Sequence, residues 1–308
     1  MAASPVKTTK IAVIGLGSMG FGMAISLARA GFDVTGADRQ AALRDRFASD
    51  HGKAAESPAA AARDAEIIVT VVVNAAQTRE VLFGPEGAAT TARKEAVIIS
   101  SATMGPADAM SLADQSAAQG LLYLDAPISG GAQRAAEGAL TILASGSEAA
   151  FAKARPALDA MAAKLYQLGD EPGTGASFKM INQLLAGVHI AAACEAITFA
   201  KQLDLDIAKV YEVITGSAGN SWMFENRVPH VLDGDYTPRS AVDIFTKDLG
   251  IINDMSRAQK FPTPIAAQAL QMFLMTAAAG MGRDDDASVA RLYARIAGLE
   301  LPQKSPSR

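Results

Sequence analysis

A lysine at the start of a long apolar segment is the side chain in this sequence with the clearest chemical use. Lys179 ends the run GTGASFK, and Asn182 and Gln183 follow three and four residues later, on the same face of a helix. The helix dipole disfavours a lysine in the first turn, so this placement needs another reason. The amine can exchange a proton with the hydroxyl group of a substrate that the two amides hold. A lysine on the protein surface is the alternative.

A glycine-rich loop near the N-terminus predicts a dinucleotide site. An apolar strand, Ile11–Ile14, runs into Gly15, Leu16, Gly17, Ser18, Met19 and Gly20, and a helical segment follows. The first glycine of such a loop allows a tight turn, the second lets the backbone approach a pyrophosphate, and the third lets the helix pack closely on the strand. The free N–H groups at the start of the helix then bind the phosphates.

The end of the second strand indicates which dinucleotide is bound. Asp38 lies eighteen residues past Gly20, where a carboxylate accepts hydrogen bonds from the ribose hydroxyls of the adenosine. A carboxylate there repels a 2′-phosphate, so the sequence predicts NAD rather than NADP. Arg39 leaves an alternative, because its guanidinium could hold a 2′-phosphate if Asp38 turned away.

Three further loops are expected at the carboxyl edge of the same sheet, where such folds bind ligands. Val73 and Asn74 end the third strand and would flank the adenosine, and Thr103 follows the fourth and would reach the nicotinamide ribose. Both polar residues could instead be turn or helix-capping groups. Ser129, Gly130 and Gly131 follow the fifth strand, and their hydroxyl and backbone N–H groups form a receptor for a carboxylate.

The elements that carry these residues form two different halves. Short β-branched runs alternate with helical segments, which predicts a doubly wound parallel sheet of the Rossmann type. The strands are expected at Ile11–Ile14, Asp33–Ala37, Ile67–Val73, Ala96–Ser100, Leu121–Leu124 and Leu140–Ala144. Helices are expected at Phe178–Lys201, Ala208–Thr215, Val242–Arg257, Ile265–Ala279 and Ser288–Ala297, with a loop at Gly219–Phe224. The predicted domains are an NAD-binding domain over residues 1–170, an interdomain helix over 171–201 and an all-α substrate and oligomerisation domain over 202–308.

Composition excludes several classes of partner. The chain has 308 residues, a formal net charge of -4 and no basic block, which argues against nucleic acid or an anionic membrane as its main partner. The first ten residues lack the apolar core of a secretion signal, and the apolar run Leu184–Ala200 is better explained as a core helix than as a membrane span. We therefore predict a soluble cytoplasmic protein. The apolar helical half predicts self-association as a homodimer or homotetramer.

The cysteine and the histidines predict no further chemistry. Cys194 is the single cysteine, so the chain has no internal disulfide, and its Ala-rich surroundings favour a small buried side chain over a reactive thiol. The three histidines, His51, His189 and His230, lack the spacing of metal ligands, so no metal site is expected. His189 could share the face of Lys179, although a hydrogen-bonded core histidine is the commoner case.

Four motifs in order resemble one family. GLGSMG, DAPISGG, GTGASFKMINQ and FTKDL, spread between Lys10 and Leu301, are similar to the β-hydroxyacid dehydrogenases related to 3-hydroxyisobutyrate dehydrogenase. The resemblance implies that Lys179 is the catalytic general acid/base and that Ser129, Gly130 and Gly131 hold a substrate carboxylate. It also implies that Thr103 lies near the nicotinamide. Lys247, in the fourth motif, would close the active site and contact substrate and cofactor in the cleft between the domains.

Two departures from the family pattern point to a different substrate. Relatives have two asparagines where this chain has Asn182 and Gln183, and the segment ending at Thr103 reads Ser-Ala-Thr. The stretch Lys179–Glu195 is most similar to members that act on a four-carbon sugar acid, a polyhydroxylated substrate that uses extra amide and hydroxyl partners. A small anionic hydroxy acid is therefore the predicted substrate. The alternatives are 3-hydroxyisobutyrate, reduction of tartronate semialdehyde, and a regulatory dinucleotide-binding module without activity.

Overall fold

The computed structural model describes residues 8–304, and the chain divides into two compact units. The first unit ends at Lys179 and the second begins at Met180, so the division falls inside the long helix α8 (Thr174–Gln202). This helix occupies the stretch expected for the interdomain helix. Its first six residues belong to the first unit and its remainder to the second.

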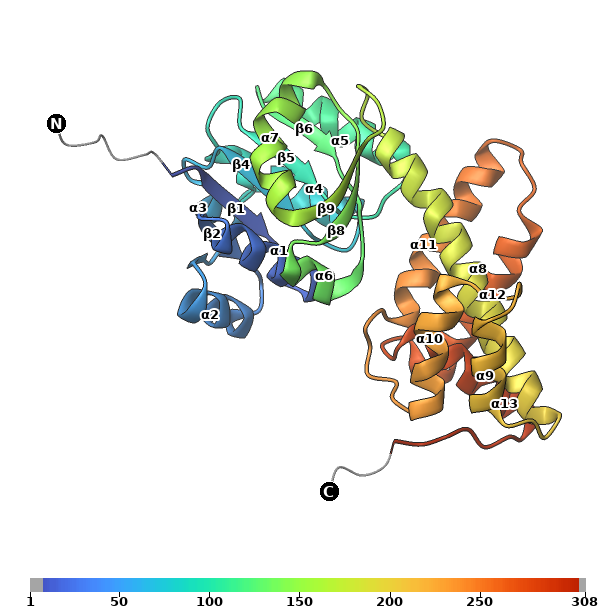
Figure 1. Ribbon diagram of the computed structural model, residues 1–308. Helices are drawn as coiled ribbons and strands as arrows, with labels where there is room; N and C mark the ends of the chain where they lie inside the picture. Colours follow the sequence, from blue (N-terminus) through green and yellow to red (C-terminus); the bar gives the residue numbers. More distant parts are fainter. Residues whose placement is uncertain (1–7, 305–308) are drawn as a thin grey trace. The chain divides into compact units, whose positions relative to one another are not determined.

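A six-stranded parallel sheet forms the centre of the first unit (Figure 1). Its strands lie in the order β3 (Lys53–Ala55), β2 (Asp33–Ala37), β1 (Lys10–Ile14), β4 (Ile67–Thr70), β5 (Val97–Ser100) and β6 (Leu122–Asp125). The order reverses between β1 and β4, and a crevice for ligands opens at such a point in folds of this type. The glycine-rich loop follows β1 at the same point.

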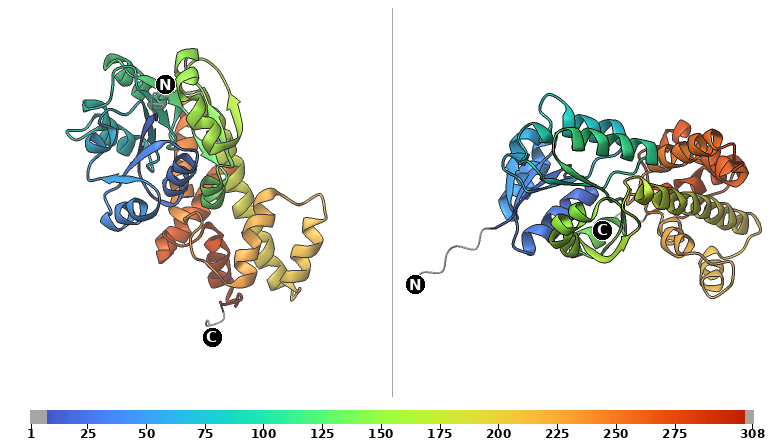
Figure 2. Two further views of the ribbon diagram at one scale, coloured as in Figure 1. Left: turned by 60° about the vertical axis from the view of Figure 1, so that its left-hand side comes forward. Right: turned by 90° about the horizontal axis from the view of Figure 1, so that it is seen from above.

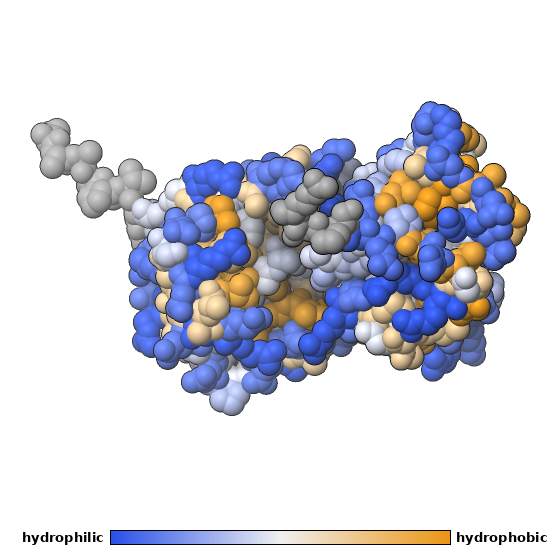
Figure 3. Space-filling view, turned by 90° about the horizontal axis from the view of Figure 1, so that it is seen from below, coloured by the Kyte–Doolittle hydropathy of each residue, from blue (hydrophilic) through white to orange (hydrophobic). Residues whose placement is uncertain are grey.

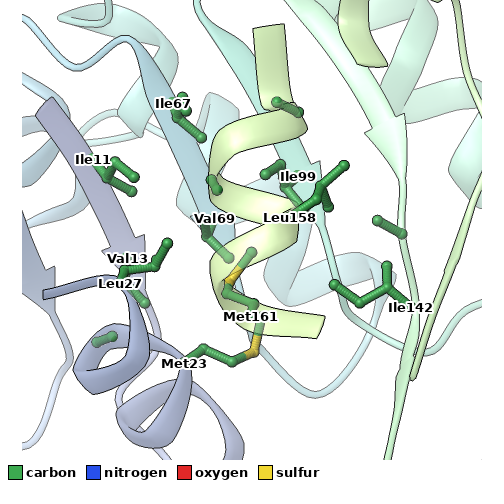
Figure 4. Packing of buried hydrophobic residues seen from close by; sticks show 14 of the residues in the cluster. Ile11, Val13, Met23, Leu27, Ile67, Val69, Ile99, Ile142, Leu158 and Met161 are labelled. Atoms are coloured by element: carbon green, nitrogen blue, oxygen red, sulfur yellow. The ribbon is translucent and has the colours of Figure 1, made fainter. Parts of the chain in front are cut away.

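Helices cover both faces of this sheet, so strand residues point alternately into two cores. Ile11 and Val13 belong to the core that contains residues of α1 and α7, whereas Ala12 and Ile14 belong to the core with α3 and α5. Figure 4 shows the first core, with Leu158 and Met161 of α7 over the sheet. The helices of the unit are α1 (Ser18–Arg29), α2 (Ala41–Asp50), α3 (Pro58–Ala62), α4 (Ala75–Phe83), the 3-10 turn η1 (Ala88–Thr90), α5 (Pro106–Ala118), α6 (Gly131–Glu137) and α7 (Glu148–Met161).

A second, three-stranded sheet corrects one sequence prediction. Leu140–Ala144, expected in the parallel sheet, forms β8, which pairs with β7 (Ile128–Ser129) and β9 (Ala162–Gln167) instead. An isolated bridge between Asp125 and Ser145 joins it to the end of β6. The sixth strand of the main sheet is β3, which the sequence did not reveal because Lys53–Ala55 contains no β-branched residue.

The second unit consists of helices around their own hydrophobic core (Figures 1 and 2). After α8 they are α9 (Ile207–Thr215), α10 (Trp222–Asp233), α11 (Val242–Ala258), α12 (Pro264–Thr276), the π-helical turn η2 (Ala277–Met281), the 3-10 turn η3 (Asp286–Ser288) and α13 (Val289–Ala297). The loop expected up to Phe224 is wrong in its last residues. Ser221 caps α10 by accepting the N–H of Phe224, so the helix begins at Trp222.

Two helical stretches in the described residues are long and apolar enough to cross a membrane, α8 and Pro264–Met281. More than half of the most apolar window of α8, 56%, is buried within the protein. Ile190, Cys194 and Ile197 of this helix lie in the core of the second unit. This burial is typical of the central helix of a soluble protein.

Candidate active site

The start of α8 is anchored to the ends of β6 and β8. Oδ2 of Asp125 accepts the backbone N–H groups of Gly173, at 3.0 Å, and Ala176, at 2.6 Å. The Ser145 hydroxyl accepts the N–H of Gly175 at 2.9 Å. These three bonds satisfy donors at a helix start that would otherwise lack partners. Burial raises the pKa of the Asp125 carboxyl to about 6, although the two backbone donors favour its charged form.

Each of the two glycines in the GTGASFK run is required for a different structural reason. Gly173 has a φ of +99°, which other residues rarely adopt. A Cβ atom on Gly175 would lie 2.4 Å from the carbonyl oxygen of Leu143, so only glycine lets the helix approach β8 this closely. The helix therefore starts at Thr174 rather than at Phe178, and Lys179 is in its second turn. The helix-dipole argument for Lys179 is wrong for that reason.

Lys179 is almost completely buried, with 7% of its surface exposed. Its Nζ donates a hydrogen bond of 2.8 Å to the carbonyl oxygen of Ile128 in β7. Ile128 directly precedes Ser129, so the amine lies beside the turn that the sequence predicts to hold a carboxylate. The fold thus brings two of the predicted site segments, far apart in the sequence, to one place in the first unit.

The turn that follows β7 depends on its two glycines. Gly130 has a φ of +138° and Gly131 a φ of +81°, and α6 begins at Gly131. Ser129 is the last residue of β7. A hydroxyl and adjacent backbone N–H groups in such a turn can receive an anionic group such as a carboxylate.

The glycines of the N-terminal loop fit a dinucleotide. A Cβ atom on Gly15 would lie 2.4 Å from the backbone oxygen of Val71. A Cβ atom on Gly20 would lie 1.9 Å from the backbone oxygen of Gly15, so both positions need glycine for packing. Gly17 differs, because no atom lies within 4 Å of a Cβ placed there. The open space at Gly17, the residue before α1, suits the close approach of a pyrophosphate.

Asp38 is fixed at the end of β2 next to this loop. One carboxylate oxygen accepts the N–H of Leu16 and the other accepts the N–H of Gln40, both at 2.8 Å. Arg44 donates to the backbone carbonyl oxygen of Asp38, and the side chain of Arg39 is exposed. Each carboxylate oxygen has a second lone pair for a further donor. The geometry therefore keeps a negative charge beside the loop.

The other expected cofactor residues follow β4 and β5. Asn74 caps α4 by accepting the N–H of Gln77 at 2.9 Å, and the N–H of Val73 donates to the Gln77 side chain. β4 ends at Thr70, earlier than the predicted Val73. Thr103 is half-buried, three residues past β5.

The remaining predicted residues lie in the second unit and are linked through Asp248 by hydrogen bonds and an ion pair. Gln183, 8% exposed, donates from Nε2 to Oδ2 of Asp248 at 2.5 Å. The other Asp248 oxygen lies 2.6 Å from Nζ of Lys247, and Asn182 donates to Oε1 of Gln183 at 3.0 Å. Sequence reasoning gave Asp248 no role, although its place after Lys247 in FTKDL was a usable signal.

The cysteine and histidines take no part in these groups. Cys194 is a buried free cysteine, and burial raises the pKa of its thiol, which keeps it protonated. His230 is buried against Asp285, with Nδ1 and Oδ1 2.7 Å apart, and His189 lines an apolar groove. Between residues 8 and 304, no three His, Cys, Asp or Glu side chains are grouped so that they could hold a metal ion.

Two family models match consecutive parts of the chain. The model of the NAD binding domain of 6-phosphogluconate dehydrogenase matches residues 10–169. A model described as NAD-binding of NADP-dependent 3-hydroxyisobutyrate dehydrogenase matches residues 173–293. Together they cover both units.

Curated relatives and solved structures are similar over nearly the whole chain. L-threonate dehydrogenase of Cupriavidus necator is 52% identical, over 96% of this chain and 98% of its own length. The L-threonate dehydrogenase of Escherichia coli K12 is 45% identical, over 95% and 96%. A crystal structure of 3-hydroxyisobutyrate dehydrogenase from Salmonella typhimurium, 47% identical, has a TM-score of 0.88 and covers 92% of this chain and 99% of that one. The Mycobacterium tuberculosis enzyme of that name, 28% identical, has a TM-score of 0.82 over 93% and 99%.

Proposed function

This chain belongs to the family of NAD(P)-binding dehydrogenases related to 3-hydroxyisobutyrate dehydrogenase, and we propose that it oxidises L-threonate with NAD. The observation that carries the catalytic part is the position of the Lys179 amine beside the Ser129–Gly131 turn. The names of relatives 45–52% identical support L-threonate, the kind of four-carbon sugar acid that the stretch Lys179–Glu195 predicted.

Lys179 is the proposed general base. NAD, when bound, supplies the acceptor for the hydride. The substrate carbon loses hydrogen with its electron pair, its hydroxyl proton moves to the neutral amine of Lys179, and the alcohol becomes a carbonyl group. A bond to the Ile128 carbonyl needs one N–H, which the amine has both with and without the extra proton. Ile128 can therefore hold Lys179 in one place throughout the reaction.

Ser129, Gly130 and Gly131 are the proposed receptor for the substrate carboxylate. Their hydroxyl and N–H groups suit an anion, and the neighbouring Lys179 bond sets the distance from carboxylate to base. Asn182, on the exposed face of α8, is proposed to bind a substrate hydroxyl, and Lys247 is proposed as a second cation for substrate and cofactor.

NAD is the proposed cofactor because of Asp38. Its carboxylate is held by Leu16 and Gln40, so it keeps its place beside the loop, where a 2′-phosphate would add a second negative charge. The loop residues Gly15–Gly20 are proposed to bind the pyrophosphate, with Val73 and Asn74 on the adenosine side and Thr103 on the nicotinamide side.

Initial rates across a set of three- and four-carbon acids test the substrate. L-threonate, its stereoisomers, 3-hydroxyisobutyrate and tartronate semialdehyde are each assayed with both cofactors. We expect the highest kcat/KM for L-threonate with NAD. A preference for 3-hydroxyisobutyrate, the substrate in the name of the 47% identical Salmonella structure, would replace L-threonate. No turnover with any acid would favour a dinucleotide-binding regulatory module.

An exposed apolar stripe on α8 supports self-association. Leu185, Ala192, Ala196 and Phe199 are exposed at helical spacing, and grooves of about 520 and 630 Å³ run along both sides of the last three. Hydrophobic residues gather on the surface of the helical unit in Figure 3. A helix from a second copy could pack into such grooves, so we propose a homodimer or homotetramer. We also propose a cytoplasmic location, in keeping with a soluble enzyme that uses NAD.

A further inference from the structure

We propose that Gln183 positions Lys247 through the carboxylate of Asp248 and does not itself bind the substrate. The inference deepens the proposed function, in which Lys247 is the second cation of the site. It differs from the sequence-based expectation that the amide of Gln183 orients the substrate. It is supported by the contacts of the Gln183 amide and of the Asp248 carboxylate, and by the close packing of α8 against α11.

Both ends of the Gln183 amide are used within the second unit. Nε2 donates to Asp248 at 2.5 Å and Oε1 accepts from Asn182 at 3.0 Å. The opposite orientation of the amide would set its oxygen against a carboxylate oxygen. The side chain is also buried, with 8% of the residue exposed. Gln183 is thus committed to the protein, while the neighbouring Asn182 is exposed.

A close helix crossing brings Gln183 to Asp248. Gly187, one turn after Gln183, faces α11, and a Cβ there would lie 2.9 Å from Leu249 and 3.0 Å from Phe245. A side chain at position 187 would force the ends of the Leu249 and Phe245 side chains to shift, so glycine favours this close approach of α8 and α11. At this crossing, the Gln183 side chain is long enough for its amide to reach the Asp248 carboxylate. An asparagine would withdraw the amide by about 1.5 Å, the length of one carbon–carbon bond, and break the contact.

The burial of Asp248 makes this contact energetically important. Asp248 is 1% exposed, and a buried carboxylate is stable only when its oxygens have partners. Gln183 donates a hydrogen bond to one oxygen, and the other oxygen forms an ion pair with Lys247 but accepts no hydrogen bond from the described residues. If the amide is lost, the carboxylate must turn to find another donor, and its ion pair with Lys247 is disturbed. Gln183 therefore helps to fix the position of the ammonium group through Asp248.

Chemical labelling of Lys247 tests this directly. The full-length enzyme is acetylated with trace acetic anhydride, and the rate at each lysine is measured by mass spectrometry. The Lys247 side chain is 19% exposed, and we expect Gln183→Ala, Gln183→Asn and Asp248→Asn to raise its rate at least about threefold. Gln202→Ala, the same change at an exposed site of α8, should leave the rate unchanged. An unchanged Lys247 rate in a folded Gln183→Ala protein would overturn the proposal, and the two Gln183 variants suffice if Asp248→Asn does not fold.

A double-mutant cycle separates positioning from direct substrate binding. We expect Gln183→Ala to lower kcat/KM about tenfold, mainly through KM, and to have less than about a twofold effect in a Lys247→Met background. A full effect in that background would mean that Gln183 contacts the substrate, and would overturn the inference. If the wild-type enzyme oxidises none of the acids, the proposed function fails while the labelling experiment still decides the role of Gln183.

Discussion

The hydrogen bond from Nζ of Lys179 to the carbonyl oxygen of Ile128 joins α8 to strand β7 at 2.8 Å. The acceptor is a backbone atom, so the contact does not depend on which side chain stands at position 128. The next residue along β7 begins the turn proposed to hold the carboxylate. The proposed base and the proposed carboxylate receptor are therefore set at a fixed spacing, which would favour acids whose hydroxyl group lies a fixed number of bonds from the carboxylate.

Replacement of Lys179 tests the proposed base. We expect Lys179→Ala to lower turnover about 10²- to 10⁴-fold, the usual contribution of a general acid/base group. NADH binding, followed by fluorescence, should stay normal because the lysine is not among the loop residues. Lys201→Ala, at the other end of α8, serves as the control. Turnover within tenfold of wild type would rule out Lys179 as the base.

Two glycine substitutions should separate cofactor binding from folding. Gly175→Ala places a Cβ 2.4 Å from the Leu143 oxygen, and we expect a loss of roughly 1–3 kcal/mol in stability, seen as a lower Tm. Gly17→Ala meets no atom within 4 Å, so its Tm should stay close to that of wild type. Its methyl group would occupy the space left for the pyrophosphate, and we expect the Kd for NADH to rise at least about tenfold. Normal NADH binding by Gly17→Ala would count against the proposed phosphate loop.

The buried carboxyl of Asp125 should make stability depend on pH. Burial raises its pKa in the folded protein from 3.8 to about 6, so between these values the folded chain holds a proton that the unfolded chain has released. Stability attributable to Asp125 therefore falls as the pH rises from about 4 to 6 and is constant above, by an amount on the order of 3 kcal/mol.

Thermal unfolding of Asp125→Asn measures this contribution. The Tm of wild type minus that of the variant should fall between pH 4.5 and pH 7. Asp286, whose pKa burial also raises to about 6, is present in both proteins and cancels in the difference. Asp114→Asn, at an exposed position of α5, should show no such trend. A pH-independent difference would mean that Asp125 is ionised throughout.

The sequence was sufficient for the fold class and the family, which are confirmed, because periodicity and ordered motifs are local signals. Sequence-based prediction failed where the pairing of strands decides the structure. Lys53–Ala55 becomes a strand only because β2 lies beside it, and Leu140–Ala144 pairs with β7 and β9, the strands before and after it in the chain, instead of extending the main sheet. In both cases the sequence of the segment does not indicate which strand it pairs with.

The candidate site was predictable to a similar extent. Motif spacing singled out Lys179 and the Ser129–Gly131 turn. It did not indicate that the backbone carbonyl of Ile128, just before this turn, accepts a hydrogen bond from the amine. Asp125 and Asp248 were overlooked, because the value of a buried carboxylate depends on donors that arrive from other elements. The length of Gln183 was noticed as unusual, and its partner became visible only when α11 was placed against α8.

Substitution of Asp38 tests the cofactor preference. Removing the charge in Asp38→Asn should raise the ratio of kcat/KM with NADP to that with NAD at least about tenfold. Arg39→Ala distinguishes the alternative in which the exposed guanidinium holds a 2′-phosphate, and we expect it to leave the wild-type ratio unchanged. A wild-type enzyme that prefers NADP, and loses that preference in Arg39→Ala, would reverse the assignment.

Charge introduced into the apolar stripe of α8 tests self-association. Phe199 is 61% exposed between the two grooves, and burying a glutamate there without a partner would cost several kcal/mol. We expect Phe199→Glu to lower the molar mass measured by light scattering to that of a smaller assembly or a monomer. Phe261→Glu, at a phenylalanine that is 66% exposed outside the stripe, should keep the wild-type mass. An unchanged mass for Phe199→Glu would place the interface elsewhere. A monomeric wild type would end the proposal, because the stripe would then have no second copy to cover it.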